Sequence, residues 1–155
     1  MKKLLTLLVI LSFTISYLPF SSLSQNSTEF WGMTNDAENG GGVIFKTDGN
    51  GDNQQIIRTF IQIPGQNPDI TQLCQATNGK LYGMTYQGGI SNAGILFEYD
   101  PTTSIFTKKM DFIGTNGSNP HGSLVKASNG GLYGMTYQGG GNAQGVLVEY
   151  DPITS

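Results

Sequence analysis

The chain has 155 residues, with 8 basic and 11 acidic side chains and a formal charge of −3. This acidic balance argues against a surface for nucleic acid or anionic membranes, so we expect no nucleic-acid partner. Cys74 is the only cysteine and His121 the only histidine, which excludes an internal disulfide and metal sites built on several such ligands within this chain.

The first 24 residues have the pattern of a secretory signal peptide. Lys2 and Lys3 precede an apolar run over residues 4–11, and a small-x-small pattern ends at Ser24. We therefore expect cleavage before Gln25 and a secreted protein, extracellular, periplasmic or on the cell surface, without a stable membrane span. The alternative is an uncleaved anchor, because the apolar segment is about as long as a roughly 20-residue membrane helix. Cleavage leaves six basic against eleven acidic residues, a formal charge of −5.

One motif then recurs three times. FWGMT at residues 30–34, LYGMTYQGG at 81–89 and LYGMTYQGG again at 132–140 begin 51 residues apart. A period near 50 residues is the length of one four-stranded propeller blade. The sequence therefore predicts an all-β fold, a β-propeller of four-stranded antiparallel blades that is incomplete, with about 2.5 to 3 blades in this chain.

The blades are expected over residues 25–64, 65–117 and 118–155, the first lacking its first strand and the last lacking its fourth. Closed propellers have typically about 4 to 8 blades. We therefore expect this sequence to be the N-terminal part of a longer product, with assembly of several copies into a ring as the alternative.

The second unit predicts four strands, over residues 72–77, 80–86, 94–100 and 105–113. Asn78-Gly79 joins the first two, and this pair between strand-like runs is a strong hairpin signal. Simple alternation in the last strand places four side chains on one face: Phe106, Lys108, Met110 and Phe112. Positions that recur in every unit are candidates for contacts between blades, namely those of Leu81, Met84, Leu96 and Phe97.

The string NGKLYGMTYQGG followed by FEYDPTTS resembles a kelch-type blade. The longer string SLVKASNGGLYGMTYQGGGNAQGVLVEYDP, preceded by NGSNPHG, is similar to the GloVer, or Gloeo-Verruco, tandem repeat. The resemblance covers the chain from about Phe30 to its end, with a looser first unit. It implies an exported bacterial protein built from repeated blades. It implies no common enzymatic activity and assigns no ligand.

Polar side chains in the predicted loops form a candidate binding face. The loops between second and third strands and the links between blades lie on one side of such blades, where amides and tyrosines can hydrogen-bond to a sugar or peptide and stack on it. The candidate ligand-binding residues are Asp36, Glu38, Tyr86, Gln87, Asn92, Asn119, His121, Tyr137, Gln138 and Asn142. The alternative is that the recurring amides only satisfy their own turns, and that His121 makes a loop hydrogen bond.

Two patterns of acidic residues are candidates for chemistry. Asp48, Asn50 and Asp52 have the spacing of calcium ligands, but Asn53 and Thr59 stand where a calcium loop has glycine and glutamate, so a polar turn is favoured and calcium is a weak cofactor candidate. The pair Glu98 and Asp100 recurs as Glu149 and Asp151, which indicates a structural role in each blade. No catalytic residue is predicted.

The sequence favours an exported, non-catalytic binding module for a glycan, a protein or a cell-surface component, with carbohydrate or a surface protein as the partner. The alternative is the N-terminal part of a propeller enzyme, a glycan hydrolase or lyase, with its catalytic groups in blades outside this chain.

Overall fold

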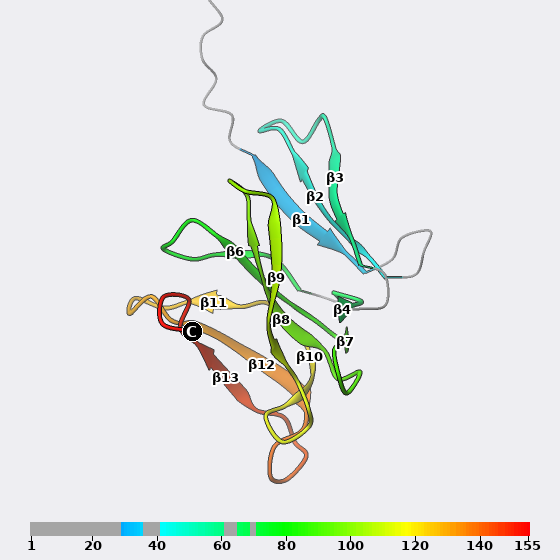
Figure 1. Cartoon of the computed structure of the whole chain (residues 1–155), viewed down its shortest axis with the longest axis vertical. Coiled ribbons are helices and arrows are strands. Elements are labelled where there is room, and N and C mark those ends of the chain that lie inside the picture. The colour runs from blue at the N-terminus through cyan, green and yellow to red at the C-terminus, as the bar shows by residue number, and fades with distance from the viewer. Residues whose placement is uncertain (1–28, 36–40, 61–64, 69–70) are drawn as a thin grey trace, which may run out of the picture.

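A computed structural model describes residues 29–35, 41–60, 65–68 and 71–155. Within these residues the chain forms antiparallel strands joined by turns and contains no helix, which confirms the predicted all-β class. Three of the four sheets have three or more strands, and these three follow one another along the long axis of the molecule (Figure 1).

We call these sheets blade 1, blade 2 and blade 3. Blade 1 has the order β1-β2-β3, with β1 (Phe30–Thr34), β2 (Val43–Thr47) and β3 (Gln55–Thr59). Blade 2 has the order β5-β6-β8-β9, with β5 (Cys74–Gln75), β6 (Leu81–Thr85), β8 (Ile95–Asp100) and β9 (Ile105–Asp111). Blade 3 contains β11 (Val125–Lys126), β12 (Leu132–Gln138) and β13 (Leu147–Tyr150), with β12 in the middle.

Three further short strands, two in the linkers and one between β6 and β8, were not predicted from the sequence. β4 (Gly65–Gln66) pairs with β7 (Gln87–Gly88), and β10 (Ser118–Pro120) pairs with the end of β12. Each linker therefore pairs with the repeat unit that follows it.

Local sequence explains the hairpins. Gly79 has a φ of +79° and donates its N–H to the carbonyl of Ala76 at 3.1 Å, while Asn78 Oδ1 accepts the N–H of Lys80. The third unit repeats this turn at Asn129 and Gly130. Because glycine adopts a positive φ without steric strain, the repeated Asn-Gly and Asn-Gly-Gly sequences set the hairpins directly.

Two hydrophobic clusters hold the blades together. Between blades 1 and 2, Phe60 packs against Phe97 and Phe106, and the guanidinium of Arg58 lies 4.1 Å from the centre of the Phe106 ring. The cluster between blades 2 and 3 consists of Ala76, Tyr82, Met84, Ala93, Leu96, Phe112, Leu124, Leu132, Val148 and Tyr150. Blade 2 is therefore covered on both faces, and every residue of β6 is buried.

The predicted common face of the last strand in blade 2 is wrong. The register shifts between Leu96 and Phe97, so that Phe97 pairs with Lys108 and Leu96 with Met110, leaving Lys109 as a bulge. A bulge residue reverses the alternation that follows it. Phe106 consequently packs toward blade 1, whereas Met110 packs toward blade 3.

Candidate interaction site on the open face of blade 3

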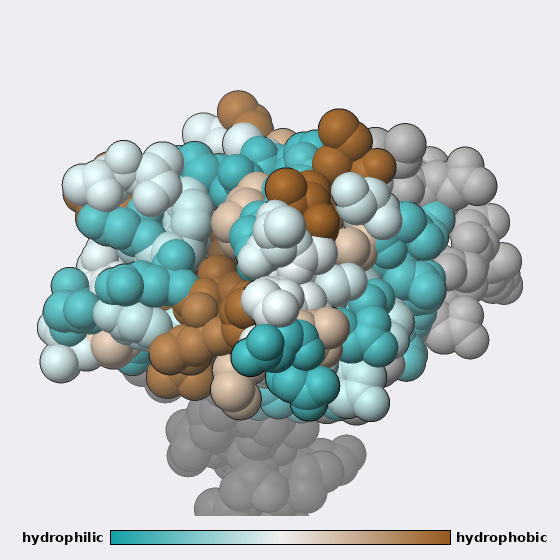
Figure 2. Space-filling model, turned by 90° about the horizontal axis from the view of Figure 1, so that it is seen from below, coloured by the Kyte–Doolittle hydropathy of each residue, from teal (hydrophilic) through white to brown (hydrophobic). Residues whose placement is uncertain are grey.

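Blade 3 contacts blade 2 with one face and leaves its other face open. Met135 pairs with Leu147 in adjacent strands, just as Met84 pairs with Leu96 in blade 2. Met84 and Leu96 are 1% and 0% exposed, whereas Met135 and Leu147 are 63% and 71% exposed. We define the open face by its four exposed large side chains, Val125, Met135, Tyr137 and Leu147. Figure 2 shows hydrophobic side chains gathered in a strip between hydrophilic ones at this end of the molecule.

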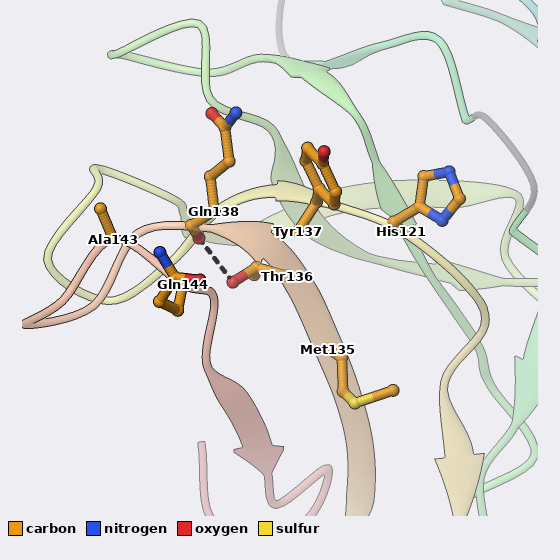
Figure 3. A pocket seen from close by; sticks show the side chains of 7 residues that line it. All are labelled: His121, Met135, Thr136, Tyr137, Gln138, Ala143 and Gln144. Atoms are coloured by element: carbon orange, nitrogen blue, oxygen red, sulfur yellow. Dashed lines mark hydrogen bonds between the residues drawn. The ribbon is translucent and has the colours of Figure 1, made fainter.

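A pocket of about 490 Å³ lies at the loop end of this face. β12 forms its floor, the β12–β13 loop one wall, and the residue after β10 the opposite side (Figure 3). Its lining residues are His121, Met135, Thr136, Tyr137, Gln138, Ala143 and Gln144.

Hydrogen bonds hold the floor of the pocket in place. Thr136 Oγ1 donates to the carbonyl of Gln138 at 2.8 Å (Figure 3). It also accepts the N–H of Val146 at 3.0 Å, which fixes the end of β12 to the residue before β13. The His121 N–H donates to the carbonyl of Met135 at 3.2 Å. The rings of His121 and Tyr137 lie side by side, with 6.3 Å between their centroids.

The lining of the pocket combines polar and apolar groups. The side chains offer amide and hydroxyl hydrogen-bonding groups, two aromatic rings and a flexible thioether, and the lining includes no carboxylate. A pair of carboxyl groups across the cleft, as glycoside hydrolysis ordinarily requires, is therefore missing from these lining residues. The pocket can pack against an apolar group and exchange hydrogen bonds with a polar one.

The structure brings three of the predicted binding residues together in the pocket: His121, Tyr137 and Gln138. Asn142 lies exposed in the adjoining β12–β13 loop. Asp36 and Glu38 lie outside the described residues. Sequence reasoning did not select Met135, Thr136, Ala143 and Gln144. The sequence carried no signal for the exposure of Met135, because the same string surrounds the buried Met84.

The remaining predicted residues make hydrogen bonds inside the fold. Asn92 Oδ1 accepts the N–H of Gly88 at 3.0 Å, and Asn67 Nδ2 donates to Gln87 Oε1 at 2.9 Å. Asn119 Nδ2 donates to the carbonyl of Tyr86 at 3.0 Å. These amides connect turns and linkers at blade 2.

The turn at Asp48 is organised by its own carboxylate. Asp48 Oδ1 accepts the N–H groups of Asn50 and Asp52, and Oδ2 accepts Asn53 Nδ2 at 2.7 Å. The bond from Asn53 is the main cause of a pKa for Asp48 below its ordinary value. Across the part of the chain that the structure describes, no group of three or more histidine, cysteine or acidic residues is arranged to hold a metal ion.

Hydrogen bonds from other side chains of blade 2 hold the carboxylate of Glu98 in place. Its carboxylate accepts Lys80 Nζ at 2.7 Å and Tyr82 Oη at 2.6 Å. Burial raises the pKa of the Glu98 carboxyl, but these two hydrogen bonds and the charges of Lys80 and Lys109 together outweigh it, so the pKa lies below its ordinary value. Desolvation, followed by the bond to Glu98, raises the pKa of Tyr82 far above its ordinary range. In blade 3, Tyr133 Oη donates to Glu149 at 2.6 Å in an exposed copy of this pair.

The fold and the site define a tandem-repeat, all-β protein with a pocket on the open face of its third blade. Residues 2–155 match the family model described as the Gloeobacter/Verrucomicrobia repeat, and the chain belongs to this family. No curated protein and no solved structure matches the chain. In the ranges that the structure describes, there is no helix with the length and hydrophobicity needed to cross a membrane.

Proposed function

We propose that the protein is an exported, non-catalytic interaction module that binds a protein partner through the open face of blade 3. The observation that carries this proposal is the exposure of Met135 and Leu147, whose counterparts Met84 and Leu96 are buried by the neighbouring blade. A contiguous apolar surface with a polar rim is typical of sites where proteins interact.

A protein partner suits this face better than a glycan. Gln138, Gln144 and Tyr137 would serve either ligand, but Met135 and Leu147 extend the site as aliphatic surface. Methionine is enriched at protein interfaces, where its flexible side chain fits irregular surfaces. The absence of a carboxylate from the pocket lining supports a non-catalytic role.

Binding can be tested by using the mature chain as bait against proteins extracted from the envelope of the organism that makes it. We expect specific proteins to be retained by the wild type and lost with the double variant Met135→Lys, Leu147→Lys. Ile90→Lys is the control, because Ile90 is 81% exposed and lies in the β7–β8 loop of blade 2, outside the residues that define the open face. Equal retention by all three proteins would refute the proposal, and release by soluble oligosaccharides would favour a glycan instead.

Export is supported by the signal-peptide pattern over residues 1–24. The test is the intact mass of the exported product. Its N-terminus is expected at Gln25, and a product that retains Met1–Ser24 in the cytoplasm would contradict this part of the proposal.

A further inference from the structure

The linker between blades 2 and 3 packs against blade 2 through two consecutive residues, Asn119 and Pro120, which we call an Asn-Pro step. The Asn119 N–H donates to the carbonyl of Ala93 at 2.8 Å, and Asn119 Nδ2 donates to the carbonyl of Tyr86 at 3.0 Å. Pro120 is buried against Gly94, where an added Cβ atom would lie 2.7 Å from Pro120 Cδ. The missing side chain of Gly94 therefore makes room for the proline ring.

The linker between blades 1 and 2 repeats part of this arrangement. The Asn67 N–H donates to the carbonyl of Gly41 at 3.1 Å, and a Cβ atom added at Gly42 would lie 2.8 Å from Pro68 Cδ. Asn67 and Asn119 have φ angles of +50° and +53°, a left-handed conformation that asparagine adopts more easily than most residues. The backbone part of the docking geometry thus serves both blade junctions, whereas Asn67 Nδ2 donates to Gln87 Oε1 of the following blade at 2.9 Å.

Blade 3 presents the same acceptor at its pocket. By repeat position, Tyr137 corresponds to Tyr86, Gln144 to Ala93 and Gly145 to Gly94. The N–H of Gly145 donates to Gly139 at 3.0 Å, as that of Gly94 donates to Gly88 at 3.0 Å, and the two glycines have φ angles of +91° and +99°. Tyr137 and Gln144 line the pocket (Figure 3). The acceptor backbone is therefore already formed on blade 3.

We propose that this pocket binds the Asn-Pro step of a further blade of the same repeat type. This inference rests on the proposed function and names the partner. The incoming asparagine donates its N–H to the carbonyl of Gln144 and its side-chain amide to the carbonyl of Tyr137, and the proline ring lies on Gly145. The sheet that follows the step covers Met135 and Leu147, as blade 3 covers Met84 and Leu96.

A second copy of this chain does not fit the pocket equally well. The sequence contains two Asn-Pro steps, Asn67-Pro68 and Asn119-Pro120. Both asparagines already donate to a preceding blade, and both prolines are buried. A second copy would have to break one of its own blade junctions to offer the step. The blade that binds here therefore brings an Asn-Pro step of its own.

The direct test extends the mature chain after Ser155 with a second copy of residues 105–155, which supplies a fourth strand for blade 3, an Asn-Pro step and a further blade. We expect the carbonyl ¹³C resonances of Tyr137 and Gln144 and the methyl resonance of Met135 to shift relative to the unextended chain. The matched control has alanines in place of the appended copies of Asn119 and Pro120. In the control, the Tyr137 carbonyl is expected to return to its position in the unextended chain.

A second measurement tests the same contact without requiring the appended blade to fold. The hexapeptide GSNPHG, the sequence of residues 117–122, is titrated into the labelled mature chain beside GSAPHG. Saturable shifts at Tyr137 and Gln144 with the first peptide, and much weaker ones with the second, support the proposal. The proposal is overturned if neither the extension nor GSNPHG shifts these carbonyls. It is also overturned if they shift on concentrating the unextended chain, which would identify a second copy as the occupant.

The two proposals fail in distinguishable ways. One outcome is that envelope proteins depend on Met135 and Leu147 for binding while the appended blade leaves the carbonyl resonances of Tyr137 and Gln144 unshifted. That result would support the interaction module and refute the blade as its partner. If the appended blade docks but no envelope protein depends on the open face, that face serves blade stacking and the proposed function is wrong.

Discussion

Met84 and Met135 occupy the same position in consecutive copies of LYGMT, yet Met84 is 1% exposed and Met135 is 63% exposed. The terminal methyl of Met84 lies against Gly134 of blade 3, where an added Cβ atom would be 2.8 Å from Met84 Cε. The difference in exposure therefore comes from the presence of a neighbouring blade on one side only, since the local sequence is the same.

The first prediction uses this pair of methionines. Met84→Ala is expected to lower the free energy of unfolding by about 2–4 kcal/mol, because it removes a fully buried side chain and leaves a cavity between blades 2 and 3. Met135→Ala should change it by less than about 0.5 kcal/mol, as is usual for exposed positions. Urea denaturation of both variants measures the difference. Equal losses would show that Met135 is covered in solution.

The second prediction concerns the approach of Phe97 to Gly83. A Cβ atom at Gly83 would lie 2.5 Å from Phe97 Cζ, in a fully buried part of blade 2. Gly83→Ala is expected to cost about 1–3 kcal/mol of stability through overpacking. Gly32→Ala is the matched control, because its clash is with Phe45, which is only half-buried and can move. Thermal or urea unfolding should rank Gly83→Ala as the more damaging change, and the reverse order would contradict this account.

The third prediction separates the two contributions of Asn119 to the blade junction. Asn119→Gly keeps access to the φ of +53° but loses the hydrogen bond to the Tyr86 carbonyl, at a cost of about 1 kcal/mol. Asn119→Ala loses the same bond and also strains the backbone, which adds roughly 1–2 kcal/mol. The urea concentration at the midpoint of unfolding should therefore be highest for the wild type, lower for Asn119→Gly and lowest for Asn119→Ala. An alanine variant as stable as the glycine variant would argue against the backbone contribution.

The fourth prediction is a dependence on pH. The pKa of Glu98 is lowered in the folded state, so its contribution to stability is fully present above the ordinary value of 4.5 and is lost as pH falls through the folded value. At pH 7, Glu98→Gln should cost about 1.5–3 kcal/mol, the usual range for hydrogen bonds to a charged group. The difference in the free energy of unfolding between wild type and Glu98→Gln should become smaller below pH 4.5.

Glu149→Gln is the control for this measurement, because Glu149 makes the same contact to Tyr133 in an exposed setting and Gly131 stands where blade 2 has Lys80. Its effect at pH 7 should be less than about 0.5 kcal/mol. If the stability difference between wild type and Glu98→Gln stays constant down to acidic pH, the negative charge of Glu98 does not contribute to its contact with Lys80 and Tyr82.

Much of the fold follows from local sequence. The repeat period, the strand runs and the Asn78-Gly79 and Asn129-Gly130 turns are set by residues that are neighbours in the chain, so pattern alone places them. The prediction for β9 was wrong because the bulge at Lys109 arises from pairing with β8, which strict alternation does not encode. Export, the partner and calcium remain predictions.

By itself, the sequence determined that this chain is built from repeated antiparallel blades and where their turns fall. Only the tertiary structure decided which copy of each repeated residue is buried. It alone showed that the linkers pair with the following blade and that Tyr137 and Gln144 meet in a pocket. The physical reason is that turns depend on contacts between neighbouring residues, whereas burial depends on which surface packs against a blade. LYGMTYQGG at residues 81–89 and at 132–140 is the same string with a different neighbour.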